Sequence, residues 1–143
     1  MRARAVPPSL LSTAWPLIEP WVATALRRGK ADQSPDDVRQ HIERGTMHLW
    51  LAWSDGEPKP RGVWVTEVLE SARGRFCNIV VLAGEQFETW HPLVGYLSEW
   101  ARENGCVRLT MVGRKGWARR LRAAGWREAA VTLERQIDGP EQD

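Results

Sequence analysis

Residue types used for metal centres and nucleophilic catalysis are scarce. The only two cysteines, Cys77 and Cys106, lie in no CxxC pattern and at no metal-ligand spacing from a histidine, so no metal site is expected. Both lie at the starts of predicted strands and are expected to be free thiols. The histidines His41, His48 and His91 are scattered and are expected to pack or face solvent. No serine lies in a nucleophile-elbow pattern.

Long apolar runs are also missing. No stretch approaches the roughly 18 residues that a membrane-spanning helix needs, and the short apolar run of the opening segment is broken by Pro16. No membrane partner is therefore expected, and the expected location is the cytoplasm or a virion assembled there. The 143 residues, 43% of them hydrophobic and 27% charged, predict one folded domain over residues 1–143, with an extended lead-in at 1–11 and a frayed tail at 138–143.

Tryptophan, by contrast, is abundant. Nine tryptophans in so short a chain predict an aromatic-rich core, with one or two free to line a groove or a partner interface. They are Trp15, Trp21, Trp50, Trp53, Trp64, Trp90, Trp100, Trp117 and Trp126.

Periodicity and capping signals predict the order α-α-β-β-β-α-β-α-β. The clearest start signal is Ser34-Pro35-Asp36-Asp37, an N-cap followed by proline and first-turn acids. The expected elements are a helix from Ser12 or Thr13 to Gly29, a helix at 34–45, strands at 47–53, 62–69 and 76–83, a helix after Gly84, a strand at 106–112, a helix at 115–124 and a strand at 127–136.

Prolines refine two of these helices. Pro16 suits a first turn, whereas Pro20 is expected to kink or divide its helix. Pro92 also suits a first turn, so the regular part of the helix after Gly84 is expected to begin near Trp90 or His91.

The stretch 76–126 forms a predicted βαβ unit with a second helix appended. Its segments LSEWARENGCVRLTMV and RRLRAAGWREAAVTLERQ resemble the long helix, strand, short helix with a Gly-aromatic close and final strand of the GNAT acyltransferase fold. The resemblance implies a single α/β (α+β) domain with a mixed central sheet, whose first strand is reduced to something near Ala5-Val6.

The resemblance also implies a place for acetyl-CoA. GNAT enzymes hold its pyrophosphate with a loop of pattern Gln/Arg-x-x-Gly-x-Gly/Ala, whose backbone N–H groups face the phosphates. After Gly84, these positions fall on Glu85, Glu88 and Trp90. Two carboxylates and an indole leave no phosphate cradle, so no cofactor is expected. The acids are also explained by the helix dipole alone.

The family's catalytic residues are similarly absent. Its usual general acid, a tyrosine, falls on Leu121, and an asparagine often found at the start of the same helix falls on Arg114. Tyr96, the only tyrosine, is expected to pack within the long helix. Glu67 is a weak candidate for a general base, with a solvent-facing strand residue as the alternative.

One feature of the family depends on backbone alone. In GNAT enzymes the acyl-pantetheine arm pairs with the splayed strand that here contains Val81, Leu82 and Ala83. A divergent enzyme could hold acetyl-CoA there without the loop.

Basic residues gather between 114 and 127. A solvated helix face explains them, and so does contact with an acidic partner or with nucleic-acid phosphates. The candidates are Arg114, Lys115, Arg119, Arg120 and Arg122, with Trp117 among them.

Three functional interpretations follow. The first is a non-catalytic interaction or assembly module with a protein partner, similar to small GNAT-like proteins of tailed bacteriophages, for which a virion structural protein is the expected partner. The second is a divergent acetyl-CoA-dependent N-acyltransferase. The third is a nucleic-acid-binding module that uses the basic helix at 114–127.

Overall fold

The computed structural model describes residues 2–113 and 115–137. Its contacts divide the chain into two compact units, residues 1–113 and residues 114–143, which are described separately below. The expectation of one domain over the whole chain stays a prediction.

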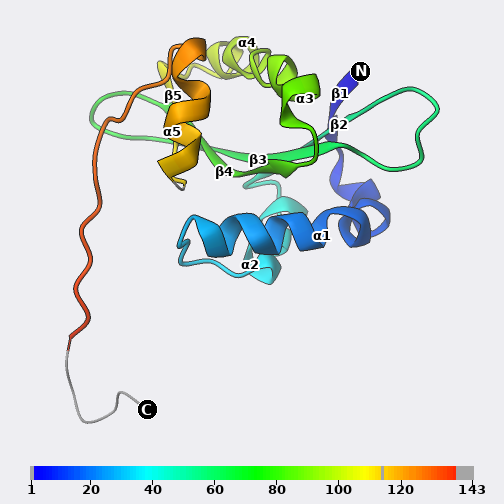
Figure 1. The fold of residues 1–143 in the computed structure, drawn as a ribbon, viewed down its shortest axis with the longest axis horizontal. Helices are drawn as coiled ribbons and strands as arrows, with labels where there is room; N and C mark the ends of the chain where they lie inside the picture. The colour runs from blue at the N-terminus through cyan, green and yellow to red at the C-terminus, as the bar shows by residue number, and fades with distance from the viewer. Residues whose placement is uncertain (1, 114, 138–143) are drawn as a thin grey trace. The chain divides into compact units, whose positions relative to one another are not determined.

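A five-stranded mixed sheet organises the first unit (Figure 1). Its order along the sheet is β1-β2-β3-β4-β5, antiparallel from β1 to β4 and parallel between β4 and β5. This confirms the predicted mixed α/β class. The strands are β1 (Arg2–Val6), β2 (His48–Trp53), β3 (Gly62–Leu69), β4 (Phe76–Gly84) and β5 (Arg108–Met111).

Helices cover both faces of this sheet. The helices α1 (Leu11–Arg28) and α2 (Pro35–Glu43) lie on one face, and α3 (Phe87–Val94) and α4 (Leu97–Glu103) lie on the other (Figure 1). The α1/α2 side holds an aliphatic core in which Ile18, Val22 and Val38 pack with the strand residues Val65 and Val81. The other side is aromatic and is described with the candidate site.

The N-terminal lead-in is more ordered than predicted. Residues Arg2–Val6 form the whole of β1, which pairs with β2 from Arg2↔Trp53 to Val6↔Leu49, and a 3₁₀ turn, η1 (Pro8–Leu10), follows. The expected extended conformation is found at Arg2–Val6, whereas residues 8–11 are helical rather than extended, and the first strand is longer than Ala5-Val6. Its own side chains are largely exposed, so the ladder to β2 holds the strand without a strong apolar pattern.

Helix α1 runs through both of its prolines. It begins at Leu11 without a side-chain cap from Ser12 or Thr13, and Pro16 and Pro20 lie inside it. The prediction that Pro16 sits in the first turn is wrong. The two prolines are four residues apart and exposed, so the carbonyl groups that lose a helical donor face solvent while the opposite face stays packed.

The predicted long helix after Gly84 is two helices. Pro92 lies inside α3 rather than in its first turn, and the chain passes from α3 to α4 through Gly95 and Tyr96 with short i→i−3 bonds such as Tyr96 N–H to the carbonyl oxygen of Leu93 (3.2 Å). The helix begins at Phe87, earlier than expected. At this junction Tyr96 is 66% exposed, so its predicted packing role is wrong.

The second unit contains α5 (Lys115–Leu121) and the 3₁₀ turn η2 (Arg122–Ala124). Gly125 ends it in the left-handed region, with φ +90°, as the Gly-Trp close predicted. The strand expected at 127–136 does not form in the described residues. Apolar alternation defines two faces, but a strand also needs a neighbour for its backbone, and Val131 and Leu133 remain exposed.

Candidate functional site

The turn between β4 and α3 is the place where the predicted cofactor site can be tested. Gly84 begins it with φ +140°, and a side chain there would overlap the carbonyl oxygen of Arg61 and lie 2.7 Å from Gly62 Cα. The close approach of β3 therefore explains this glycine without any ligand.

Hydrogen bonds within the protein already use the backbone of this turn. The N–H of Glu85 donates to the carbonyl oxygen of Arg61 (2.8 Å), and the carbonyl oxygen of Glu85 accepts from Trp90 Nε1 (2.9 Å). The carbonyl oxygen of Gln86 accepts from both the N–H and the hydroxyl of Thr89 (2.9 and 2.7 Å). The N–H groups of Glu85 and Thr89 and the carbonyl groups of Glu85 and Gln86 are thus already bonded within the protein.

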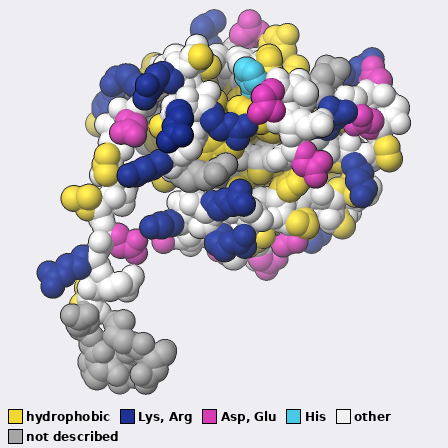
Figure 2. Space-filling model, in the orientation of Figure 1, with side chains coloured by type: hydrophobic (Ala, Val, Ile, Leu, Met, Phe, Trp, Pro, Cys, Tyr) yellow, Lys and Arg dark blue, Asp and Glu magenta, His cyan; other side chains and the backbone are white. Residues whose placement is uncertain are grey.

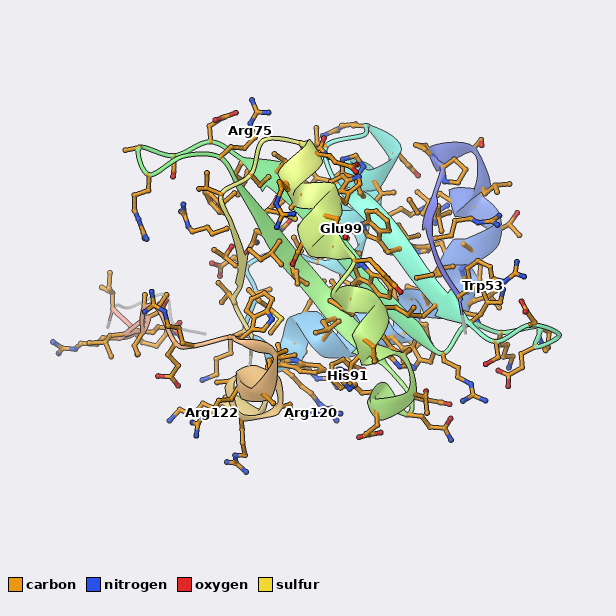
Figure 3. All side chains as sticks on the ribbon, turned by 90° about the horizontal axis from the view of Figure 1, so that it is seen from above. Trp53, Arg75, His91, Glu99, Arg120 and Arg122 are labelled. Atoms are coloured by element: carbon orange, nitrogen blue, oxygen red, sulfur yellow. The ribbon has the colours of Figure 1, made fainter. Side chains whose placement is uncertain are left out.

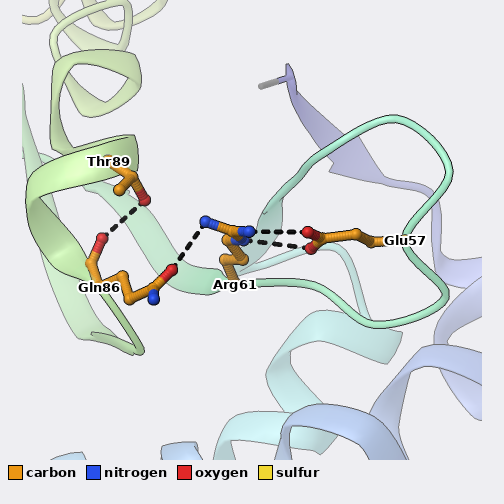
Figure 4. A network of polar contacts seen from close by, with 4 residues as sticks. All are labelled: Glu57, Arg61, Gln86 and Thr89. Atoms are coloured by element: carbon orange, nitrogen blue, oxygen red, sulfur yellow. Dashed lines mark hydrogen bonds and ion pairs between the residues drawn. The ribbon is translucent and has the colours of Figure 1, made fainter.

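Side chains reinforce the closed turn (Figure 4). Arg61 donates to both carboxylate oxygens of Glu57 (2.7 and 3.1 Å) and to Gln86 Oε1 (2.7 Å). The hydrogen bond from Arg61 lowers the pKa of the Glu57 carboxyl. The Arg61 guanidinium, which reaches the turn, is therefore engaged with a carboxylate and an amide rather than presented to a phosphate.

Trp90 fills the position that the GNAT pattern gives to its last small residue. Its side chain is fully buried, and a Cβ added at Gly62 would lie 2.5 Å from its ring, so the indole packs directly on the β3 backbone. Its ring also stacks on Trp64, with centroids 5.8 Å apart and planes 3° apart. The indole therefore lies in the interior of the first unit, at a position where the GNAT pattern has a small residue.

Trp90 is one end of a tryptophan stack made by Trp50, Trp64 and Trp90. The planes of Trp50 and Trp64 lie 5° apart, with centroids at 6.3 Å. Trp100 meets Trp50 edge-on at 5.3 Å, and Phe87 meets Trp90 edge-on at 4.9 Å. The stack makes the α3/α4 side of the sheet an aromatic core, as the tryptophan count predicted.

Two polar groups lie within or beside this aromatic core. The ring of His48 meets Trp100 edge-on at 5.2 Å, and burial lowers its pKa. The buried Trp64 Nε1 has no hydrogen-bond partner among the described residues.

Exposure of the other tryptophans varies. Of the nine tryptophans, only Trp15, Trp64 and Trp90 are buried, so the sheet and helices do not cover the whole set. The partly exposed ones are Trp21, Trp50, Trp53, Trp100, Trp117 and Trp126.

The pairing between strands β4 and β5 ends halfway along β4. Their pairing runs only from Phe76↔Arg108 to Ile79↔Met111, whereas β3 stays paired with β4 as far as Gly84. Between Val80 and Gly84, the β5 side of β4 therefore has no strand partner among the described residues. The predicted backbone positions Val81, Leu82 and Ala83 lie in this interval, where an extended ligand could add to the strand.

Glu67 takes part in a polar row across three strands. Its carboxylate accepts from Asn78 Nδ2 (3.1 Å), and Asn78 Oδ1 accepts from the hydroxyl of Thr110 (2.8 Å). The half-buried carboxylate is therefore not simply solvent-facing, as the alternative prediction had it. The sequence did not point to Asn78 or Thr110, because only the β3–β4–β5 register brings them beside Glu67.

The cysteines are free thiols, as predicted. Cys77 is buried, and burial raises its pKa to about 12, so it is a poor nucleophile at neutral pH. The ring nitrogen Nδ1 of His41 is hydrogen-bonded to the Thr46 hydroxyl at 2.8 Å. In the described ranges, no group of three or more histidine, cysteine or acidic side chains could hold a metal ion.

The basic candidates of the second unit lie on α5 and η2. Lys115, Arg119, Arg120 and Arg122 are exposed, and Figure 3 shows Arg120 and Arg122 extending from this helical segment. The Arg120 guanidinium lies over the Trp117 ring, 4.8 Å from its centroid. Arg114 lies outside the described residues. Leu121, at the family's general-acid position, is buried and has no ionisable group.

Among the residues that the structure describes, no helix combines the length and apolar character needed to cross a membrane.

Comparison with known proteins identifies the fold. No protein-family model matches the sequence, and no curated protein matches it. Solved structures do match: a probable acetyltransferase is 17% identical, with TM-score 0.69, over 96% of this chain and 100% of its own.

Two further structures agree. An aminoglycoside acetyltransferase from an uncultured soil metagenomic sample, in complex with sisomicin, is 15% identical, with TM-score 0.66 and 96% of both chains covered. A ribosomal-protein-alanine N-acetyltransferase from Brucella melitensis biovar Abortus 2308 is 10% identical, with TM-score 0.68, over 96% of this chain and 100% of its own. The chain therefore has the fold of the GNAT acetyltransferases.

Proposed function

We propose that this GNAT-fold protein does not bind acyl-CoA and acts as a non-catalytic module that binds a protein partner. The observation that carries the proposal is Trp90. Its indole occupies the position of a small residue in the GNAT loop, packs on Gly62 and donates to the carbonyl oxygen of Glu85. The turn is thus bonded to a large side chain of its own where the GNAT pattern has a small residue.

Electrostatics and chemistry support the proposal. Glu85 and Glu88 add negative charge to the turn where a pyrophosphate would need positive charge. The N–H of Glu85 is already bonded to Arg61. At the position of the family's general acid, Leu121 can neither donate nor accept a proton.

Calorimetric titration with acetyl-CoA at low salt tests the proposal. We expect no saturable heat, because the carboxylates of Glu85 and Glu88 would repel the anionic pyrophosphate at this turn. Saturable binding in the micromolar range would overturn the proposal. Titration with pantetheine alone is the companion measurement, since it carries no pyrophosphate and reports only on the unpaired edge of β4.

A charge-only variant separates electrostatics from geometry. Glu85→Gln/Glu88→Gln removes both carboxylates and leaves Trp90 in place. We expect this variant to remain unable to bind acetyl-CoA, because the indole and the used backbone groups still close the turn. Binding gained by this variant would assign the block to charge and contradict the role given to Trp90.

An active acyltransferase is the alternative, and one observation favours it. The unpaired stretch of β4 from Val80 to Gly84 is the kind of edge to which an extended acyl-pantetheine arm could add. Release of free coenzyme A thiol from acetyl-CoA in the presence of a panel of amines would favour this alternative. A rate equal to that of buffer alone would exclude it for those amines.

The proposed partner is a protein, and a structural protein of a tailed bacteriophage is the first candidate, with the cytoplasm or a virion as the site of action. Co-purification of the tagged chain with such a protein would support the candidate. Genes beside the coding sequence that include none for a virion would count against it. The alternative of a nucleic-acid partner rests on different residues and is developed next.

A further inference from the structure

The second unit begins with an uninterrupted basic segment. Between Lys115 and Arg127 the chain has five basic residues and no acidic one, and Glu128 is the first acid that follows. Elsewhere the two signs are mixed: on the face shown in Figure 2, acidic side chains lie scattered among the basic ones. The net charge of +2 therefore hides a local concentration of positive charge.

The geometry of α5 and η2 gathers part of this charge on one side. Lys115 and Arg119 are one helical turn apart, and Arg122 follows three residues later, so the three lie along the same stripe. At about 1.5 Å rise per residue the stripe is about 10 Å long. All three are exposed, and no ion pair within the described residues involves them.

Small residues flank the stripe. Gly116, Ala118, Ala123 and Ala124 carry no side chain that would hold a partner away from the helix backbone. A sugar-phosphate chain can therefore come close enough for direct contact between its phosphates and the guanidinium groups.

The other side of the helix carries an indole and a guanidinium, because at about 100° per residue Trp117 and Arg120 lie away from Lys115 and Arg119. The guanidinium of Arg120 lies over the half-exposed indole of Trp117 at 4.8 Å. Such a pair of planar groups is a surface on which an unpaired nucleobase stacks, and arginine and tryptophan are the side chains best suited to it.

We propose that the segment 115–127 binds single-stranded nucleic acid that passes around this short helix, with Lys115, Arg119 and Arg122 on the phosphates at one side and Trp117 with Arg120 against a base at the other. Arginines outnumber lysine in the segment, and their planar forks fit phosphate oxygens. An acidic protein would satisfy the charges but would leave the indole–guanidinium surface unused. The segment shares no residue with the β4–α3 turn, so the proposal does not depend on acyl-CoA binding.

Fluorescence anisotropy with a labelled oligonucleotide of about 20 nucleotides tests the proposal. We expect binding at about 50 mM salt that weakens steeply towards about 200 mM. Arg119→Ala/Arg122→Ala should weaken binding at least about tenfold and reduce the slope of log K against log salt by about 1.4, since each phosphate contact on a single strand contributes about 0.7. The control Arg27→Ala/Arg28→Ala removes an exposed basic pair from the end of α1 and should bind like the parent.

Stacking is tested separately. Trp117→Phe keeps an aromatic ring and should bind within a few-fold of the parent, whereas Trp117→Leu should bind about tenfold more weakly. Circular dichroism checks that each variant is folded. If Trp117→Leu does not fold, Trp117→Phe still tests whether an aromatic ring at this position supports binding.

Three results would overturn the proposal: no binding at low salt, equal affinity for polyglutamate, or equal affinity for duplex DNA of the same length. Equal affinity for polyglutamate would assign the segment to an acidic protein, and equal affinity for the duplex would remove the role of stacking. Unchanged affinity in Arg119→Ala/Arg122→Ala would place any binding elsewhere on the chain.

Discussion

Gly62 and Trp90 depend on one another. The indole lies on the β3 backbone where any side chain at position 62 would stand, and it also fixes the carbonyl group of Glu85. The turn between β4 and α3 thus owes its closed form to a contact with a residue on another strand.

Gly62→Ala should destabilise the protein by about 1–3 kcal/mol, because the new methyl group would lie 2.5 Å from the Trp90 ring. Denaturant unfolding measures the change in the free energy of unfolding. In the double variant Gly62→Ala/Trp90→Phe, the smaller ring should relieve part of the overlap, so its cost should be less than the sum of the two single costs. Additive costs would show that the two residues do not constrain each other.

The residues of the turn show how far the sequence could predict the candidate site. The resemblance to the GNAT fold places the family's loop positions on Glu85, Glu88 and Trp90. It could not show that the Trp90 indole bonds to Glu85 or packs on Gly62, because both contacts depend on the β3–β4 register. The polar row formed by Glu67, Asn78 and Thr110 could not be predicted from the sequence for the same reason, because it depends on the register of β3, β4 and β5.

Cys77 makes the stability sensitive to high pH. Burial raises its pKa from 9.0 to about 12, so its neutral thiol is favoured in the folded state. The resulting stabilisation is complete below about pH 9 and is lost as the pH rises towards 12. Denaturant unfolding at a series of pH values should therefore show a smaller loss of stability above pH 9 in Cys77→Ala than in the parent. Parallel pH dependences would contradict this prediction.

Helices α1 and α2 begin in different ways. The Ser34 hydroxyl accepts from Asp37 N–H (3.1 Å), and the Asp37 carboxylate accepts from Ser34 N–H (2.9 Å), which together form a capping box. The hydrogen bond from the Ser34 N–H, followed by that with the Ser34 hydroxyl, lowers the pKa of the Asp37 carboxyl. No side chain caps α1, whose first residues continue from the 3₁₀ turn η1.

Ser34→Ala should cost about 1 kcal/mol of stability, because the N–H of Asp37 loses its acceptor. Ser12→Ala is the matched control: Ser12 lies in the first turn of α1 and makes no capping hydrogen bond, so its replacement should change stability by less than about 0.5 kcal/mol. Thermal and denaturant unfolding compare the two variants. Similar costs for both would show that the capping box contributes nothing.

Elements with a strong local signal were predictable. The SPDD start gave α2, and apolar patterns gave β2, β3 and β4 nearly to the residue. The predictions failed where neighbours decide the outcome. Strand β1 exists because β2 is available to pair with it, whereas the alternating residues 127–136 have no such neighbour in the described chain.

The molecule as a whole divides at residue 113. The first unit contains the entire sheet, the aliphatic core under α1 and α2, and the tryptophan stack. Each of these lies within residues 2–113, so this unit has the contacts of a self-contained fold.

A chain that ends at Gly113 should therefore fold. We expect cooperative unfolding and a near-ultraviolet circular dichroism spectrum that retains the signal of packed indoles, because all three members of the stack remain. A non-cooperative transition with loss of the near-ultraviolet signal would show that residues 114–143 are needed to complete the fold.

The tryptophan stack also gives the protein an optical property. Three nearly parallel indoles with successive centroids 6.3 and 5.8 Å apart are close enough for excitation energy to pass among them. Because Trp90 is hydrogen-bonded to the turn, an opening of the turn that draws Trp90 with it would separate one chromophore from the other two. The native chain therefore contains an intrinsic, label-free spectroscopic sensor of whether its turn is open or closed.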